Sequence, residues 1–155
     1  MRMEENHVWA GSDRQFFAVL TKVVFITGFS RMVVERRWEA FRAAFADFAP
    51  EVVAGFDERT IERLLSRDSP IVRNARKVRA TVANAAVCVE LSNVHTSLER
   101  FAAHAGGLGK DAACRLFGRT FAAVGESAAG TLWNRLYGGV AESENRPAAP
   151  RGGFL

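Results

Sequence analysis

The fold of this chain is decided by residues 64–85, LLSRDSPIVRNARKVRATVANA. The stretch begins with the apolar end of a predicted helix, at Leu64 and Leu65, and then passes through a short polar turn at residues 66–70. A second predicted helix follows, and its first turns contain four basic residues: Arg73, Arg76, Lys77 and Arg79. The pattern predicts two helices joined by a hairpin, with positive charge around the start of the second helix.

Such a helix start is suited to binding an anion. The first N–H groups of a helix have no helical partner, and the helix dipole favours negative charge beside them. We therefore expect one nucleic-acid phosphate to be held by Arg73, Asn74, Arg76 and Lys77. The arrangement is a helix-hairpin-helix element, although its turn lacks the glycines usual in such hairpins. The alternative is a solvated basic helix face in a domain that binds proteins.

Length and composition predict a single helical domain over residues 1–140. The chain has 155 residues, of which 48% are hydrophobic, and this is enough for one core. The formal net charge of +4 fits a nucleic-acid partner without requiring one. From residue 141 the chain becomes polar and rich in proline and glycine, so we expect residues 141–155 to form a disordered tail.

The cysteines and the apolar runs predict a cytoplasmic protein. Cys88 and Cys114 stand far apart and form no CxxC pair, which indicates thiols in a reducing compartment. The first residues are polar and acidic, unlike a secretory signal. The longest apolar run, residues 16–29, contains Lys22 and is too short to cross a bilayer, so we expect no membrane partner.

Apolar residues recur at spacings of three and four along almost the whole chain, which predicts an all-α fold. We expect Asp13 to cap a first helix that ends at Gly28, and Ser30 to cap a continuous second helix through Phe48. No stretch alternates with period two for long enough to be a strand. The other expected helix boundaries are Pro50, Asp57, Thr96 (in a capping box with Glu99) and Gly106, with two more helices around Phe117 and Trp133.

Several short motifs occur in the order and spacing of one known family. They are Gly28-Phe29-Ser30, Phe41-Arg42-Ala43-Ala44-Phe45, Phe48-Ala49-Pro50, Val53-Ala54, Ile71-Val72-Arg73-Asn74, Lys77-Val78 and Asn84-Ala85. In this order they resemble the central part of the DNA-3-methyladenine glycosylase I family. The likeness covers residues 16–91, and it is weaker over residues 101–138.

The resemblance implies a helical helix-hairpin-helix DNA glycosylase, which flips a damaged base out of the duplex and hydrolyses its N-glycosidic bond. It also implies a monomer that binds duplex DNA with an alkylated base such as 3-methyladenine and uses no cofactor. Alkylated purines are cationic, so aromatic faces and carboxylates suit their pocket. The expected base pocket contains Trp9, Phe25, Phe29 and Arg31, and a place in the core is the alternative for the three aromatic residues.

Two departures from the family pattern concern this pocket. Val23 stands where better-known members have a base-recognising glutamate, and Arg31 replaces a pocket tryptophan with a charge that would repel a cationic base. The alternative function is therefore a DNA-binding module that keeps the scaffold but has lost catalysis. Glu126, beside a turn that the family places near its cleft, is a candidate relocated catalytic carboxylate, or else an ordinary acidic residue at a helix start.

We expect no metal site. The family holds a structural zinc with two cysteines and two histidines near the chain ends. Here the N-terminal cysteine is absent, and residues 139–143 contain neither histidine nor cysteine, so His7 alone cannot form the site. His95, His104 and Cys114 have no spacing that is diagnostic of metal binding.

Overall fold

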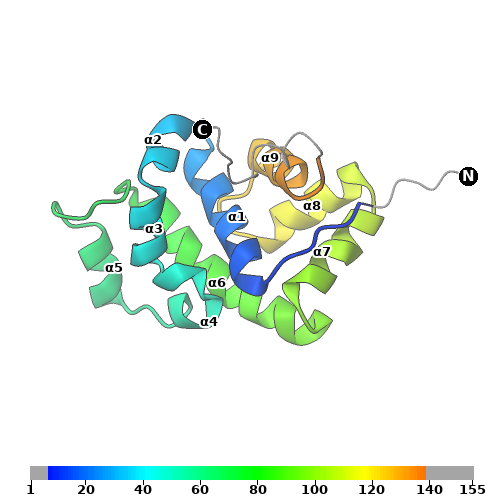
Figure 1. Cartoon of the computed structure of the whole chain (residues 1–155), viewed down its shortest axis with the longest axis horizontal. Helices are drawn as coiled ribbons and strands as arrows, with labels where there is room; N and C mark the ends of the chain where they lie inside the picture. The colour runs from blue at the N-terminus through cyan, green and yellow to red at the C-terminus, as the bar shows by residue number, and fades with distance from the viewer. Residues whose placement is uncertain (1–6, 139–155) are drawn as a thin grey trace, which may run out of the picture.

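Helices follow one another through the computed structural model, which describes residues 7–138 (Figure 1). They are α1 (Asp13–Ile26), α2 (Arg31–Arg36), α3 (Trp38–Ala44), the short helix η1 (Ala46–Phe48), α4 (Pro50–Val53), α5 (Glu58–Leu64), α6 (Ala75–His95), α7 (Leu98–Gly107), α8 (Lys110–Thr120) and α9 (Glu126–Tyr137). The predicted all-α fold is confirmed, and these residues include no strand. Within residues 7–138 no helix combines the length and apolar character of a membrane span. The predicted boundary at residue 140 and the predicted tail, residues 141–155, lie outside the described residues.

Helix α1 is at the centre of the fold (Figure 1). It contacts α2, α4, α6, α7 and α9. Six of its apolar side chains are almost completely buried: Phe16, Phe17, Leu20, Val23, Val24 and Phe25. A helix with this many buried apolar side chains is stable in water only when other elements surround most of it. The surrounding helices therefore fix the C-terminal end of α1, where the chain turns at Gly28.

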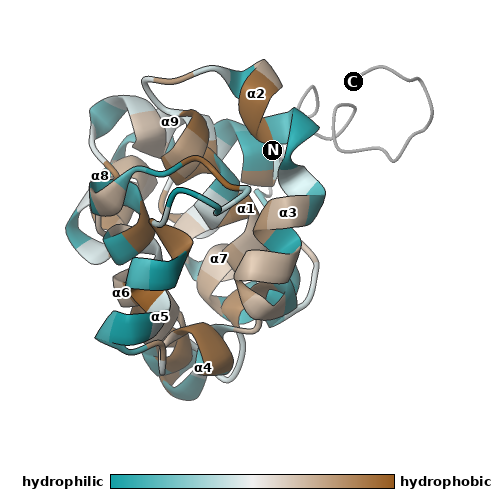
Figure 2. Cartoon of the chain, turned by 90° about the vertical axis from the view of Figure 1, so that its left-hand side faces the viewer, coloured by the Kyte–Doolittle hydropathy of each residue, from teal (hydrophilic) through white to brown (hydrophobic). Residues whose placement is uncertain are grey.

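The surrounding helices have one apolar and one polar side. Figure 2 shows brown and teal segments within single helices, as expected of this pattern. In α7, for example, Leu98 and Phe101 are buried, whereas Glu99 and Arg100 are exposed. Removing apolar surface from water, at about 25 cal/mol per Å², orients each helix toward α1 and the core around it.

Three predicted helix boundaries are confirmed. The Ser30 hydroxyl accepts a hydrogen bond from Val33 N at 3.1 Å, and the Asp57 carboxylate accepts one from Thr60 N at 2.9 Å. Each side chain satisfies an N–H group that the helix start leaves open. Helix α4 begins at Pro50, where a missing N–H costs no helical hydrogen bond. The bond from Thr60 also holds the pKa of the Asp57 carboxyl below its ordinary value.

Two predicted caps are displaced by one residue. Ser12 rather than Asp13 caps α1, and Ser97 rather than Thr96 caps α7. The Asp13 carboxylate instead accepts a hydrogen bond from Leu98 N at 2.9 Å. It therefore links the start of α1 to the start of α7, a long-range role that local sequence cannot show.

The predicted continuous helix from Ser30 to Phe48 is wrong. The chain forms α2 and α3 and then a left-handed turn, in which the φ angles of residues 46–48 are 54°, 55° and 60°. Left-handed φ is costly for residues other than glycine. Asp47 in this turn accepts hydrogen bonds from Arg14 and Arg42, and these ion pairs hold the turn against the strain.

The predicted helix-hairpin-helix element is confirmed. Helices α5 and α6 are joined by residues 65–74, a connection longer than the expected polar turn. Ile71 in this connection is buried and anchors it to the core. The Arg79 guanidinium of α6 donates two hydrogen bonds to the Glu58 carboxylate of α5, at 2.9 and 2.6 Å, which ties the two helices together. This ion pair lowers the pKa of the Glu58 carboxyl.

The segment before α1 lies across α7 at Gly106. A Cβ atom added at Gly106 would stand 2.0 Å from the His7 carbonyl oxygen, whereas one added at Gly107 would meet nothing within 4 Å. We expect Gly106→Ala to lower the free energy of unfolding by about 1–3 kcal/mol because the added methyl group displaces this segment. Gly107→Ala is the matched control, and it should stabilise by up to about 1 kcal/mol through helix propensity. Urea unfolding followed by circular dichroism measures both, and equal effects would refute the contact.

Candidate nucleic-acid interface

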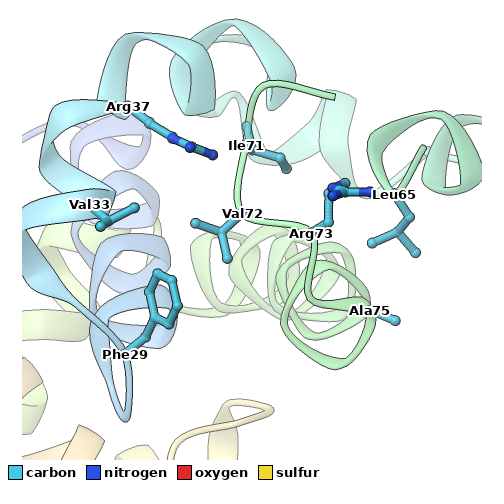
Figure 3. A pocket seen from close by; sticks show the side chains of 8 residues that line it. All are labelled: Phe29, Val33, Arg37, Leu65, Ile71, Val72, Arg73 and Ala75. Carbon is cyan, nitrogen blue, oxygen red and sulfur yellow. The ribbon is translucent and has the colours of Figure 1, made fainter. Parts of the chain in front are cut away.

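A groove of about 610 Å³ opens between the turn after α1 and the hairpin before α6. It is lined by Phe29, Val33, Arg37, Leu65, Ile71, Val72, Arg73 and Ala75 (Figure 3). One wall comes from the α1–α2 turn and α2, and the other comes from the hairpin and the first residue of α6. The fixed end of α1 and the anchored hairpin therefore set the width of the groove.

Phe29 presents an aromatic ring at one wall of the groove. It follows Gly28, whose φ of +73° is in the left-handed region that glycine adopts without strain. The Phe29 N–H donates to the Ile26 carbonyl at 3.0 Å, which closes the turn. The side chain is 48% exposed, although a ring of this size is usually buried. An exposed aromatic face beside a groove can stack on a planar ligand such as a nucleic-acid base.

The groove is electropositive. Arg37 and Arg73 line opposite walls, and no acidic side chain is among the described lining residues. Within residues 7–138 neither arginine has an ion-pair partner, unlike Arg79 nearby, which pairs with Glu58. Two exposed guanidinium groups that pair with no carboxylate in the described part of the chain are suited to binding phosphate oxygens.

The predicted phosphate-binding residues lie at the start of α6, but they do not act alike. Arg73 and Arg76 are exposed there, as expected. The Asn74 side chain accepts a hydrogen bond from Lys77 N at 3.0 Å and so serves as the helix cap. The expectation that Lys77 binds a phosphate is wrong. Lys77 is only 8% exposed, and its ammonium group donates a hydrogen bond inward to the carbonyl oxygen of Phe25.

The four residues expected to form one base pocket do not come together. Only Phe29 lines the groove. Phe25 is completely buried and packs edge-on against Phe41, with ring centroids 4.8 Å apart. Trp9 packs against Phe16 at the opposite end of α1, with centroids 5.6 Å apart. The sequence left a place in the core as the alternative for Phe25 and Trp9, and the structure supports this alternative.

Arg31 belongs to an ion cluster on α2. Its Nε donates to Glu35 Oε2 at 3.2 Å, and the same oxygen lies 4.0 Å from Lys22 Nζ and 3.8 Å from an Arg135 nitrogen. Sequence reasoning missed Glu35, although its i,i+4 spacing from Arg31 indicates such a pair. Val23, where the resemblance implies a glutamate, is completely buried in the apolar core.

Glu126 lies away from the groove. It is exposed in the first turn of α9, where an acidic residue complements the helix dipole. It borders a separate depression of about 470 Å³ with Cys114 and Arg115, and this depression shares no residue with the groove. Among the described residues, no group of three or more histidine, cysteine or acidic side chains is placed to hold a metal ion.

The groove includes residues that sequence reasoning did not select: Val33, Arg37, Leu65, Ile71, Val72 and Ala75. A signal for two of them was present, because Ile71 and Val72 interrupt a polar connection with apolar side chains. For Arg37 there was none, since it is one of two adjacent arginines between the predicted apolar positions Val34 and Trp38.

Comparison with solved structures supports the fold. The chain is similar to a 3-methyladenine DNA glycosylase I, with a TM-score of 0.71, 22% identity, and coverage of 87% of this chain and 84% of that one. A Staphylococcus aureus 3-methyladenine DNA glycosylase I gives 0.64 and 23%, with coverage of 86% and 81%. The solution structure of another 3-methyladenine DNA glycosylase I gives 0.68 and 22%, with coverage of 87% and 81%.

A comparison with sequence-family models shows the family of this chain, whereas the structural similarities show only its fold. The model of the family described as methyladenine glycosylase matches residues 5–113, which is more than half of the chain. The match includes both walls of the groove, the hairpin and the start of α6. The chain therefore belongs to the methyladenine glycosylase family.

Proposed function

We propose that this protein is a base-excision DNA glycosylase that removes alkylated purines such as 3-methyladenine from duplex DNA. Membership of the methyladenine glycosylase family supports the reaction, and one similar glycosylase has been solved as a Y16F variant in complex with 3-methyladenine. The observation that carries the proposal is the groove, where an exposed aromatic ring and two arginines lie beside the start of a 21-residue helix.

The groove supplies contacts of two kinds. Arg73 and Arg76 stand at the start of α6, where N–H groups without helical partners are also suited to binding an anion, so this wall suits a backbone phosphate. Arg37 on the facing wall suits a second phosphate. Phe29, on the same wall as Arg37, offers the ring on which an unstacked base can rest.

The reaction needs little proton transfer from the protein. An N-alkylated purine carries a positive charge, so it leaves C1′ with the electron pair of the broken N-glycosidic bond and becomes neutral. Water forms the new bond to C1′ and loses a proton to solvent. A groove without a carboxylic acid among its described lining residues is compatible with this chemistry, since the leaving base needs no general acid.

We also propose that the protein acts as a monomer on duplex DNA, within one domain over residues 1–140. Cys88 is buried and Cys114 is partly buried, and both are free thiols, which supports a location in the cytoplasm. Burial raises the pKa of the Cys88 thiol well above its ordinary value, so this thiol is unreactive.

The test is release of free base from alkylated DNA. We expect the protein to release 3-methyladenine from methylated duplex DNA above the protein-free rate, measured by chromatography under single-turnover conditions. Phe29→Ala and Arg73→Ala should each reduce the rate by about tenfold or more, because each removes one contact of the groove. Glu126→Gln tests the remaining sequence-based catalytic candidate, and we expect it to leave the rate unchanged.

The second candidate function is a DNA-binding module without catalysis. Val23 favours it, because a buried valine occupies the position of the family's base-recognising glutamate. This module would bind methylated duplex with the same dependence on Arg73 but would release no base. Binding without release therefore assigns the chain to the second function, and neither binding nor release refutes both.

A further inference from the structure

Lys77 is the charged residue of α6 that faces inward. It is 8% exposed and lies on a buried ridge of the helix with Thr81, Asn84 and Cys88. These residues follow the spacing i, i+4, i+7 and i+11, so they share one helix face. A lysine on such a face is unusual, because burying an ammonium group is costly unless hydrogen bonds compensate.

The compensating hydrogen bonds come from the end of α1. Lys77 Nζ donates to the Phe25 carbonyl oxygen at 3.0 Å and to the Thr27 carbonyl oxygen at 2.7 Å. The last carbonyl groups of a helix lack helical partners, and the helix dipole favours a cation beside them. The same ammonium stands 5.9 Å from the centre of the Phe29 ring. Lys77 therefore caps α1 from 50 residues away in sequence.

Lys77 is also tied to the start of its own helix. Its backbone N–H donates to Asn74 Oδ1 at 3.0 Å, which caps α6 immediately after Arg73. One wall of the groove holds Phe29, two residues after Thr27, and the other holds Arg73 and Ala75. Lys77 therefore contacts both walls of the groove. Its ammonium group holds the end of α1 before Phe29, and its backbone N–H holds the cap of α6 beside Arg73.

We propose that Lys77 is a positioning residue that sets Phe29 against the phosphate-binding start of α6. The effect on DNA binding rests on the proposed function, whereas the effect on the α1–α2 turn does not. Burial, with a smaller repulsion from Arg76, lowers the pKa of the Lys77 ammonium. Burial therefore opposes the charge. A neutral side chain of similar length removes the buried charge but leaves the carbonyl oxygens of Phe25 and Thr27 without this donor.

The first arm of the test is Lys77→Met, measured by amide hydrogen exchange on the protein alone. The N–H groups of Thr27 and Phe29 donate to the carbonyl oxygens of Val23 and Ile26 in the last turn of α1. We expect both to exchange at least about tenfold faster in the variant, because the turn loses its anchor. The Ala122 N–H, held by Asn84 on the same ridge, should keep its rate.

A matched variant separates positioning from general loss of stability. Thr81→Val removes a buried hydroxyl that donates to the Lys77 carbonyl at 2.8 Å, one turn along the same ridge. It should leave the relative exchange of Thr27 and Phe29 unchanged. If Lys77→Met does not fold, Lys77→Gln keeps one donor and should give rates between those of the wild type and an uncapped turn. Unchanged exchange at Thr27 and Phe29 in a folded Lys77 variant would overturn the proposal.

The second arm measures affinity for a labelled duplex with one abasic-site analogue across a salt series. Lys77→Met should weaken binding about tenfold with an unchanged salt slope, because no phosphate contact is lost. Arg73→Met should make the slope shallower by about one unit. A slope made shallower by Lys77→Met would show a phosphate contact and refute the positioning role. If the wild type binds no DNA, the proposed function fails, and the exchange arm still decides the role of Lys77.

Discussion

Reversing both groove charges, Arg37→Glu with Arg73→Glu, is expected to lower affinity for duplex DNA by at least about a hundredfold at ~0.1 M salt. Each arginine lines one wall of the groove, and neither has an ion-pair partner within residues 7–138. The change therefore removes two phosphate contacts and places two negative charges against the DNA backbone. Fluorescence anisotropy across a salt series measures the affinity and its salt slope, which should become shallower by about two units.

The control for net charge is Arg100→Glu. Arg100 is exposed on α7, which lies on the opposite side of the molecule from the hairpin (Figure 1). Arg100→Glu changes the net charge by the same amount as either single groove variant, but it should alter the affinity less than about threefold at the same salt concentration. If Arg73→Glu and Arg100→Glu lower the affinity for duplex DNA equally, binding depends only on the net charge of the protein, and the groove is not the DNA-binding site.

The fold was predictable to the extent that local chemistry determines it. Ser30, Pro50 and Asp57 mark helix starts through hydrogen bonds or backbone geometry within one turn, and a sequence shows such interactions directly. The break before Phe48 was not predictable in this way. Its left-handed turn depends on Arg14, which is far from Asp47 in the sequence, and helical periodicity continues across the break.

The base pocket was mispredicted because most sides of α1 are apolar, with Arg14, Gln15 and Lys22 as exceptions. Periodicity identifies a buried face only when the opposite face is polar, and around Phe25 both faces are apolar. The sequence therefore could not show that Phe25 packs against Phe41 and Phe45 while Phe29 reaches the groove. The left-handed turn at Gly28 redirects the chain, so the Phe29 ring is exposed at the groove whereas the Phe25 ring is buried.

The inward orientation of the Lys77 side chain, by contrast, could have been predicted from the helical spacing of its neighbours. Thr81, Asn84 and Cys88 follow it along one helix face, and all are small or uncharged residues that can be buried. Arg76 and Arg79 lie off this ridge and are exposed. Treating the four basic residues as one group concealed this difference. Grouping them by helix face would have separated the inward ammonium of Lys77 from the outward guanidinium groups of Arg76 and Arg79.

Phe25→Ala is expected to lower the free energy of unfolding by about 3–5 kcal/mol. The side chain is completely buried, and its ring packs against Phe41 and Phe45 at centroid distances of 4.8 and 6.3 Å. The substitution removes apolar surface and leaves a cavity that the central helix cannot easily close. Denaturant unfolding followed by circular dichroism measures the loss. Phe25→Leu, which keeps most of the volume, should cost about 1.5 kcal/mol or less.

Phe29→Ala completes the comparison, because the same substitution four residues later should act on binding rather than on stability. Phe29 is 48% exposed, so we expect Phe29→Ala to change the free energy of unfolding by less than about 1 kcal/mol. Its affinity for duplex DNA should fall about tenfold. The two phenylalanines are four residues apart, on either side of Gly28, so opposite outcomes would locate the boundary between core and groove within this short segment. A folded Phe25→Ala protein with normal stability and lost DNA binding would return Phe25 to the base pocket and refute this boundary.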